Sequence, residues 1–332
     1  MDLLLLVAGA ALIAVAAVDA LTTTLVVAAG AGPLSGPLTR LAWRGLLRVS
    51  RDGSRLLVVA GPALLVLTLL TWVALLWLGW TLVLLAGDDS VVDATTSAPA
   101  GPWDVAYFAG FTVFTLGVGD YVASTPGWRL ATATASFSGL FLITLAITYL
   151  GQVVGAVVAR RALAVRIDSL GRSPADIVAR GWTGSDLASS LVQHLVSITG
   201  QVATSAEQHL AYPVLHFMRA TDERTAPGLA LARLDDAMLL VQHALPPGQR
   251  PPASLTEPVR EAVRRFLDAV DTAALATLPA EPPPGPDVAA LRASGVPEVG
   301  VEQLERALDE ERDHRRRLLQ LVRGEGWSWP GV

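Results

Sequence analysis

Three long apolar runs with almost no charge dominate the first half of the sequence, at Leu3 to Ala29, Leu56 to Ala86 and Leu130 to Ala159. A helix needs about 20 residues to cross the hydrocarbon core of a bilayer, so each run is long enough. Only 17% of the chain is charged, and the charge density rises after Arg160. The sequence therefore predicts an all-α membrane protein with a separate region at 161–332.

The arginines predict the orientation in the membrane, because positive charge accumulates on the cytoplasmic side. They flank the ends of the second and third runs that would face the cytoplasm, whereas the intervening loop at 87–103 is acidic. These arginines are Arg40, Arg44, Arg48, Arg51, Arg55, Arg160, Arg161 and Arg166. We expect a multi-pass protein of the bacterial inner membrane, with residues 1–30 as an N-terminal transmembrane helix starting outside. The 161–332 region would be cytoplasmic. The first run lacks the basic start of a signal peptide.

Two features of the membrane half need separate interpretation. The arginines of segment 34–55 recur at helical spacing, which predicts a juxtamembrane amphipathic helix on the inner leaflet. They lie outside the spanning runs, so voltage sensing is not expected of them. Asp19, in contrast, lies inside the first run. Acids within membrane helices are costly, and both a structural hydrogen-bonded role and a gating or proton-linked role remain open for Asp19.

A short aromatic segment separates the second and third runs. Pro102 and Asp104 are helix-opening residues, and they predict a helix at 103–114 that is too short to span. The strip "TLGVGD" at 115–120 follows. Irregular backbone at membrane depth is tolerated only where protein buries it or water lines it. The sequence therefore predicts a re-entrant half-helix followed by a backbone strip with a specific purpose.

This strip resembles the filter of potassium channels, which reads TVGYG followed by Asp. The similarity extends through Tyr121-Val122 to "STPGWR" at 124–129, and covers roughly residues 56–160. It implies a channel pore with an outer helix at 56–86, a pore helix at 103–114, a filter at 115–120 and an inner helix at 129–159. It also implies a homotetramer, since four strands are needed to surround an ion.

By this resemblance, backbone carbonyls of the filter bind dehydrated K⁺. The ion-binding residues would be Thr115, Leu116, Gly117, Val118 and Gly119. Alternating glycines suit such a strip because glycine tolerates positive φ. Val118 stands where the family usually has Tyr, which removes a bracing phenol. We expect Asp120, Tyr107 and Phe111 to support the filter instead, with a Tyr107–Asp120 hydrogen bond.

The inner helix carries small and β-branched residues. The resemblance places Gly139 at a hinge, and Ile143, Ile147 and Gly151 along a gate that closes by dewetting. Gly151 and Gly155 also form a small-xxx-small pair. Packing of these glycines against the second helix is the alternative, and the sequence does not decide between the two.

Helix signals, and no strand alternation, characterise region 161–332. Periodic segments at 185–218, 228–244, 255–276 and 301–323 predict a helical domain, with helices opening at Ser173-Pro174 and Ser185-Asp186. The acids at 309–313 and Arg315 to Arg317 predict i, i+4 pairs on a solvated helix. The histidine spacings match no metal site, the chain has no Cys, and no phosphate-binding or catalytic motif is found.

The main hypothesis is a tetrameric, potassium-selective channel that is not an enzyme, needs no cofactor and binds no nucleic acid. K⁺ would be its permeant ion and the bilayer its setting, with the regulatory ligand and gating stimulus unidentified. A non-selective cation channel is the alternative, because of Val118. A non-conducting, membrane-anchored helical scaffold is an alternative of another class. Replacement of Gly117 by Ala separates channel from scaffold.

Overall fold

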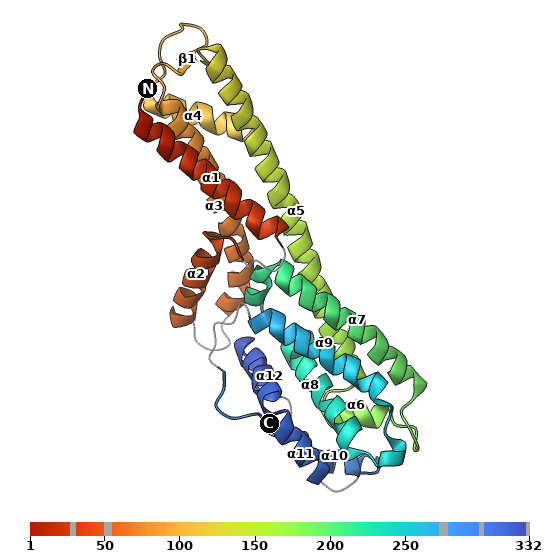
Figure 1. The fold of residues 1–332 in the computed structure, drawn as a ribbon. Coiled ribbons are helices and arrows are strands. Elements are labelled where there is room, and N and C mark those ends of the chain that lie inside the picture. Colours follow the sequence, from red (N-terminus) through yellow and green to blue (C-terminus); the bar gives the residue numbers. More distant parts are fainter. Residues whose placement is uncertain (27–30, 50–54, 272–277, 299–301, 330–332) are drawn as a thin grey trace. The chain divides into compact units, whose positions relative to one another are not determined.

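The computed structural model describes residues 1–26, 31–49, 55–271, 278–298 and 302–329 (Figure 1). Contacts divide the chain into two compact units, each described by itself. The membrane unit comprises residues 1–46 and 62–153, and the helical unit comprises residues 47–61 and 154–332.

Among the described residues, three helices are long and apolar enough to cross a membrane: α1 (Leu3–Leu25), α3 (Arg55–Leu85) and α5 (Pro126–Leu170). Asp2 opens α1 by accepting from the backbone of Leu4 and Leu5. α1 lies directly against α3, because a Cβ built on Gly9 would be only 2.6 Å from the Gly79 carbonyl oxygen. The chain is an all-α membrane protein, as the sequence predicts.

A short re-entrant helix and a two-stranded hairpin lie between α3 and α5. The helix α4 spans Pro102–Val113, β1 spans Val91–Asp93 and β2 spans Tyr121–Ala123. The strands pair antiparallel, with Val92 opposite Val122. The sequence predicts a loop at 87–103, and the pairing of β1 with the residues that follow the 115–120 strip is a feature that the sequence did not predict.

The remaining helix of the first 50 residues is α2 (Ser35–Val49). It falls inside the predicted amphipathic segment at 34–55, of which residues 50–54 lie outside the described residues. Its first turn is held by α1, as described below.

The helical unit is built from α-helices and short 3-10 or π segments (Figure 1). In chain order they are α6 (Pro174–Arg180), α7 (Ser189–Ala211), η1 (Pro213–Phe217), η2 (Glu223–Thr225), α8 (Pro227–Leu239), η3 (Leu240–Ala244), η4 (Pro247–Gln249), α9 (Ala253–Asp271), α10 (Val288–Ala293), α11 (Glu302–Glu310) and α12 (Arg312–Gly324).

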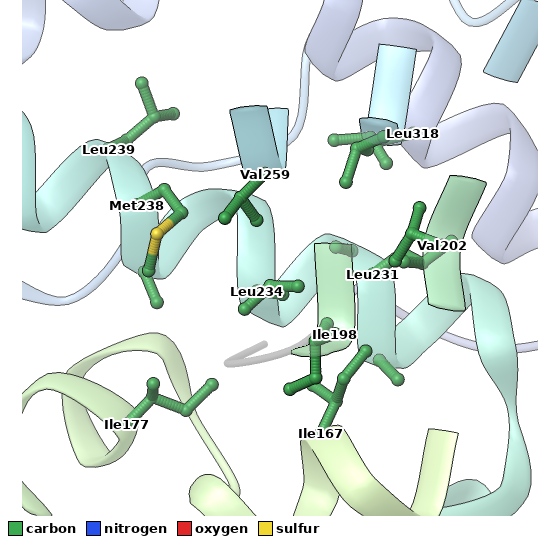
Figure 2. Packing of buried hydrophobic residues seen from close by; sticks show 14 of the residues in the cluster. Ile167, Ile177, Ile198, Val202, Leu231, Leu234, Met238, Leu239, Val259 and Leu318 are labelled. Atoms are coloured by element: carbon green, nitrogen blue, oxygen red, sulfur yellow. The ribbon is translucent and has the colours of Figure 1, made fainter. Parts of the chain in front are cut away.

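Helix α8 forms the centre of this unit. Every one of its residues is buried, and it contacts α6, α9 and α12. Leu231, Leu234 and Met238 lie on one face of α8 and pack with Ile167 and Ile198 in one cluster (Figure 2). The charged residues Arg233, Asp235 and Asp236 of α8 are also buried, each beside an oppositely charged side chain.

Several details of the helical unit differ from the sequence predictions. Ser173 caps α6 as predicted, but Ser185-Asp186 opens no helix. Residues 183–186 form a turn in which the Thr183 hydroxyl donates to the Asp186 carbonyl oxygen, and α7 starts later. The predicted helix at 301–323 is two helices, α11 and α12, and α10 was missed. Residues 272–277, part of a predicted helix, lie outside the described residues.

Candidate functional site

Helix α4 is held by hydrogen bonds at its start and along its length. Pro102 is its first residue and Asp104 accepts a 3.1 Å hydrogen bond from the Gly101 backbone, which confirms the predicted start. The buried face of α4 packs against α3 and the hairpin through a cluster that includes Phe108 and Phe111. The indole of Trp77 on α3 donates to the Ala106 carbonyl at 2.9 Å. α4 is therefore anchored through its own backbone to the helix that precedes it.

The backbone after α4 alternates in handedness. Thr115, Gly117 and Gly119 have φ of 58°, 62° and 88°, whereas Leu116 and Val118 do not have positive φ. An extended strand turns successive carbonyls to opposite sides, and a residue of opposite hand at every second position cancels that reversal. This arrangement directs neighbouring carbonyls to one side, as an ion-binding ladder requires. Positive φ costs a β-branched residue energy, so Thr115 is the strained member.

The start of the strip is tied back to α4. The backbone N–H of Leu116 donates to the Phe111 carbonyl at 2.7 Å, and the N–H of Thr115 donates to Thr112 at 3.1 Å. The residues from Phe114 to Asp120 are all exposed in the single chain, with Leu116 70% and Val118 50% exposed. The strip is thus held by hydrogen bonds on one end and leaves its apolar side chains without cover from its own chain.

Aromatic side chains lie behind the strip. Phe111 is buried and makes edge contacts with Tyr107 at 5.2 Å and Phe108 at 5.1 Å between ring centroids. Tyr107 lies near enough to Asp120, and Tyr121 to Asp104, for each carboxylate to act on the phenol. The Tyr107–Asp120 hydrogen bond expected from the sequence, and its role in supporting a filter, stay predictions.

The hairpin holds the far end of the strip. The backbone N–H of Ala94 donates to the Asp120 carbonyl at 2.9 Å, and that of Ser124 donates to Ser90 at 3.0 Å. Asp93, just before, accepts from the backbone N–H groups of Thr96 and Thr95, which lowers the pKa of its carboxyl. These hydrogen bonds hold the exit of the strip in place, and no pattern in the sequence predicts them.

Helix α5 runs without a break through the predicted hinge. A Cβ built on Gly139 would lie 1.9 Å from the carbonyl oxygen of Val113, at the last turn of α4. Glycine is therefore required at 139 for the approach of α4 to α5. The neighbouring Ser138 accepts a 3.0 Å hydrogen bond from the Trp80 indole of α3. Packing accounts for this glycine, and hinge motion at 139 stays a prediction.

The predicted gate residues share one side of α5 that its own chain leaves open. Leu140 and Ile147 are 56% and 65% exposed, Ile143 is half-buried and Gly151 is exposed. No described atom lies within 4 Å of a Cβ built on Gly151. Gly151 therefore does not pack against α3, the alternative that the sequence left open. This side of α5 is therefore exposed in the chain.

Asp19 is completely buried and fully hydrogen-bonded. Its Oδ1 accepts from the backbone N–H groups of Leu34 at 2.6 Å and Ser35 at 3.0 Å, and its Oδ2 accepts from the Trp72 indole at 2.7 Å. The hydroxyl of Thr23 accepts from Gly32 at 2.9 Å beside it. The geometry gives Asp19 the structural role, as the cap of α2, and leaves a gating role untested.

The indoles of α3 are the contacts that sequence reasoning missed. Trp72, Trp77 and Trp80 donate to three different elements: α1, α4 and α5. A buried indole N–H usually finds a partner, so three tryptophans within nine residues of an apolar run were the available signal. α3 is thus the helix on which the membrane unit is assembled.

The charged residues of the helical unit pair across helices, which corrects the prediction for the C-terminal segment. Arg315 is buried and its guanidinium bonds to both oxygens of Asp236 on α8, at 3.2 and 3.1 Å. Arg317 pairs with Asp268 on α9. The Arg316–Asp313 pair is local, but at i, i+3. The segment therefore forms a buried junction at Arg315, whereas Asp309, Glu310 and Asp313 are exposed as predicted.

The histidines lie apart from any cluster of metal ligands within the part of the chain that the structure describes. His314 contacts Asp235 at 3.1 Å, and His209 stacks edge-on with His216 and Phe266. Burial, aided by the positive charge of Arg160, lowers the pKa of His209 well below its usual value. These contacts place His314 and His209 in the packed interior.

The fold and the alternating strip define an ion-channel domain. A family model described as "Ion channel" matches residues 67–156, which include α4, the strip and most of α5. The "Uncharacterized membrane protein YdjJ" of Bacillus subtilis (strain 168) is 33% identical over 326 residues, 98% of this chain and 95% of that protein. The chain belongs to the same family as YdjJ, and it is an ion channel. No solved structure matches it.

Proposed function

We propose that four copies of this chain form a potassium-selective channel in the bacterial inner membrane. The observation that carries the proposal is the alternation of positive and negative φ from Thr115 to Gly119, at the end of a re-entrant helix. Carbonyls of these residues would replace the water shell of K⁺, and the Thr115 hydroxyl would add a further oxygen.

Exposed apolar side chains support the assembly into a tetramer. Leu116 and Val118 on the strip, and Leu140 and Ile147 on α5, remain exposed in one copy. Side chains on these elements would face the permeation path or a neighbouring subunit. One strip cannot surround an ion, and a closed ring of four copies can.

The expected orientation places the helical unit in the cytoplasm. Arginines gather near the start of α3 and along α5 after residue 159, and none occurs in segment 87–103. The backbone N–H of Asp2 donates to the Ala86 carbonyl at 2.8 Å, so α1 starts where α3 ends. Both ends would lie outside the cell.

Val118 favours a second candidate, a cation channel with weak selectivity. Its side chain is 50% exposed and carries no group that donates a hydrogen bond. A filter with Val in place of the usual Tyr lacks the hydrogen bond of that hydroxyl. The carbonyls of such a filter would be held less rigidly and would discriminate less between K⁺ and Na⁺.

The test is reconstitution of the purified chain in planar bilayers, with K⁺ on one side and Na⁺ on the other. A reversal potential near that of K⁺ is expected, and one near zero would favour the weakly selective channel. Gly117→Ala, at φ of 62°, should abolish the current. Gly127→Ala is the control, since that helical glycine lies in open space. Function unchanged by Gly117→Ala would favour a scaffold.

A further inference from the structure

The short helix η1 contacts two helices that continue into the ion-channel domain. On α5, the Arg160 guanidinium donates to the Leu215 carbonyl at 2.8 Å. On α3, a Cβ built on Gly61 would lie 2.5 Å from the Phe217 carbonyl oxygen and 2.9 Å from the Met218 sulfur. Both contacts lie within the helical unit. One five-residue segment therefore touches the beginning of α3 and the last third of α5.

Arg160 also connects α5 to the opposite end of the helical unit's sequence. Its guanidinium lies 3.4 Å from Glu325, and both side chains are largely buried. Glu325 also accepts a 2.9 Å hydrogen bond from the backbone of Gly228, at the start of α8. Loss of one member of a buried ion pair leaves the other charge without compensation. The contacts of Arg160, Leu215, Phe217, Gly61 and Glu325 are called the η1 joint below.

Beyond Arg160, α5 is part of the core of the helical unit. Leu163, Ala164 and Ile167 are buried in the main cluster with α8. α5 is one continuous helix from Pro126 to Leu170, so a displacement of its buried C-terminal end also moves the part of α5 in the ion-channel domain. η1 is a 3-10 helix, whose hydrogen bonds are poorer than those of α-helices. It is therefore the softer partner in the joint.

Few ionised side chains surround Arg160 in the η1 joint. His209 of α7 and His216 of η1 face Arg160, and Arg219 also lies near His216. Neither ring nitrogen of the buried His209 has a hydrogen-bond partner among the described residues. With both imidazoles neutral, Glu325 is the carboxylate that balances Arg160. Neutralising Glu325 should therefore loosen the joint as strongly as removing Arg160.

We propose that the η1 joint couples the helical unit to the pore, so that the contacts of the joint, when formed, set the open probability of the channel. The proposal rests on the channel activity proposed above. A change of the helical unit that moves η1 acts on α3 and α5 together, because η1 contacts both.

The test compares Arg160→Ala and Glu325→Gln with the control Arg161→Ala, whose side chain is exposed on the next position of α5. Single-channel recording should show that both variants shift the open probability in the same direction by at least about fivefold. Fivefold is the lower end of the effects that coupled sites have on each other. The double variant should shift it no further than either single one. Unit conductance and reversal potential should stay unchanged, since the filter is untouched.

Hydrogen exchange measured on the same proteins needs no current. Exchange at residues 213–218 should be faster in both joint variants and unchanged in Arg161→Ala. Faster exchange with unchanged open probability would show a joint that only stabilises the fold, and would overturn the proposal. Unchanged exchange would also overturn it. Absence of current in the wild-type chain as well, with faster exchange in the variants, would instead contradict the proposed function.

Discussion

The indole nitrogen of Trp72 donates a 2.7 Å hydrogen bond to a carboxylate oxygen of Asp19, inside the membrane unit. The other oxygen of Asp19 caps α2 by accepting from Leu34 and Ser35. A helix N-terminus carries about half a positive charge, which favours a carboxylate there. One acidic side chain thus joins α1, α2 and α3, and its burial is compensated by three donors.

Asp19→Ala should destabilise the chain by about 3 kcal/mol or more, because three buried donors lose their acceptor. Trp72→Phe removes one donor and should cost about 1–2 kcal/mol. Thermal unfolding in detergent, followed by size-exclusion chromatography, measures both. Asp88→Ala is the matched control, with a side chain that is 92% exposed. Equal behaviour of Asp19→Ala and Asp88→Ala would contradict the capping role.

Gly139→Ala should disrupt the membrane unit, since the new Cβ would lie 1.9 Å from the Val113 carbonyl. Relief requires α4 and α5 to separate, and such overpacking costs about 1–3 kcal/mol or more. Gly151→Ala, in open space on the same helix, should leave folding unchanged. The yield of monodisperse protein distinguishes them. Normal folding of Gly139→Ala would favour a flexible contact here over close packing.

The sequence predicts the membrane unit better than the helical unit, for a physical reason. The local signals in the sequence each correspond to a part of the structure. The apolar runs of spanning length form α1, α3 and α5, Pro102 and Asp104 open α4, and the paired glycines lie in the strip with positive φ. The contacts of Trp77 and the approach of α4 to Gly139 depend on residues far apart in sequence. No periodicity encodes which helix an indole will reach.

In the helical unit, even more of the contacts join residues that are far apart in sequence and could not be predicted. Arg315 belongs to a charged segment that looks solvated, yet it is buried because Asp236 on α8 reaches it from 79 positions away. Helix periodicity identified α8 and α9 but not their partners. Breaks such as the one between α11 and α12 are set by packing, which a single sequence does not display.

Tyr107→Phe should destabilise the conducting state, because it removes the phenol that lies near the Asp120 carboxylate and is predicted to donate to it at the exit of the strip. A hydrogen bond worth about 1 kcal/mol corresponds to a shift of about fivefold between conducting and collapsed strips. Faster decay of macroscopic current is the expected readout. Tyr121→Phe, which affects Asp104 at the other end of α4, should change the decay less. Equal decay in wild type and Tyr107→Phe would exclude the brace.

Stability of the chain should fall as the pH drops below about 6.5. Burial, with Arg160 and Arg219 nearby, lowers the pKa of His216 from 6.5 to about 4. Between these values the unfolded chain binds more protons than the folded one, so the free energy of unfolding rises with pH and levels off above 6.5. His209 contributes with the same sign. His216→Phe should remove up to about 3 kcal/mol of this dependence, measured by denaturation at pH 4.5 and 7.5. An equal pH dependence in wild type and His216→Phe would contradict this assignment.

Removing one member of the Arg315–Asp236 pair should lower the free energy of unfolding strongly, whereas replacing both members by apolar residues should lower it less. Arg315→Met removes the cation beside the buried Asp236 carboxyl, whose pKa burial already raises to about 6. It also frees the carbonyls of Pro283 and Pro284, to which Arg315 donates. We expect a loss of about 3–5 kcal/mol. The double variant with Asp236→Leu removes both charges and should recover much of that loss. Chemical denaturation measures both. Arg265→Met, which breaks an exposed i, i+4 pair on α9, should cost less than about 1 kcal/mol. If the double variant were less stable than Arg315→Met alone, the proline carbonyls rather than the ion pair would account for the requirement for Arg315.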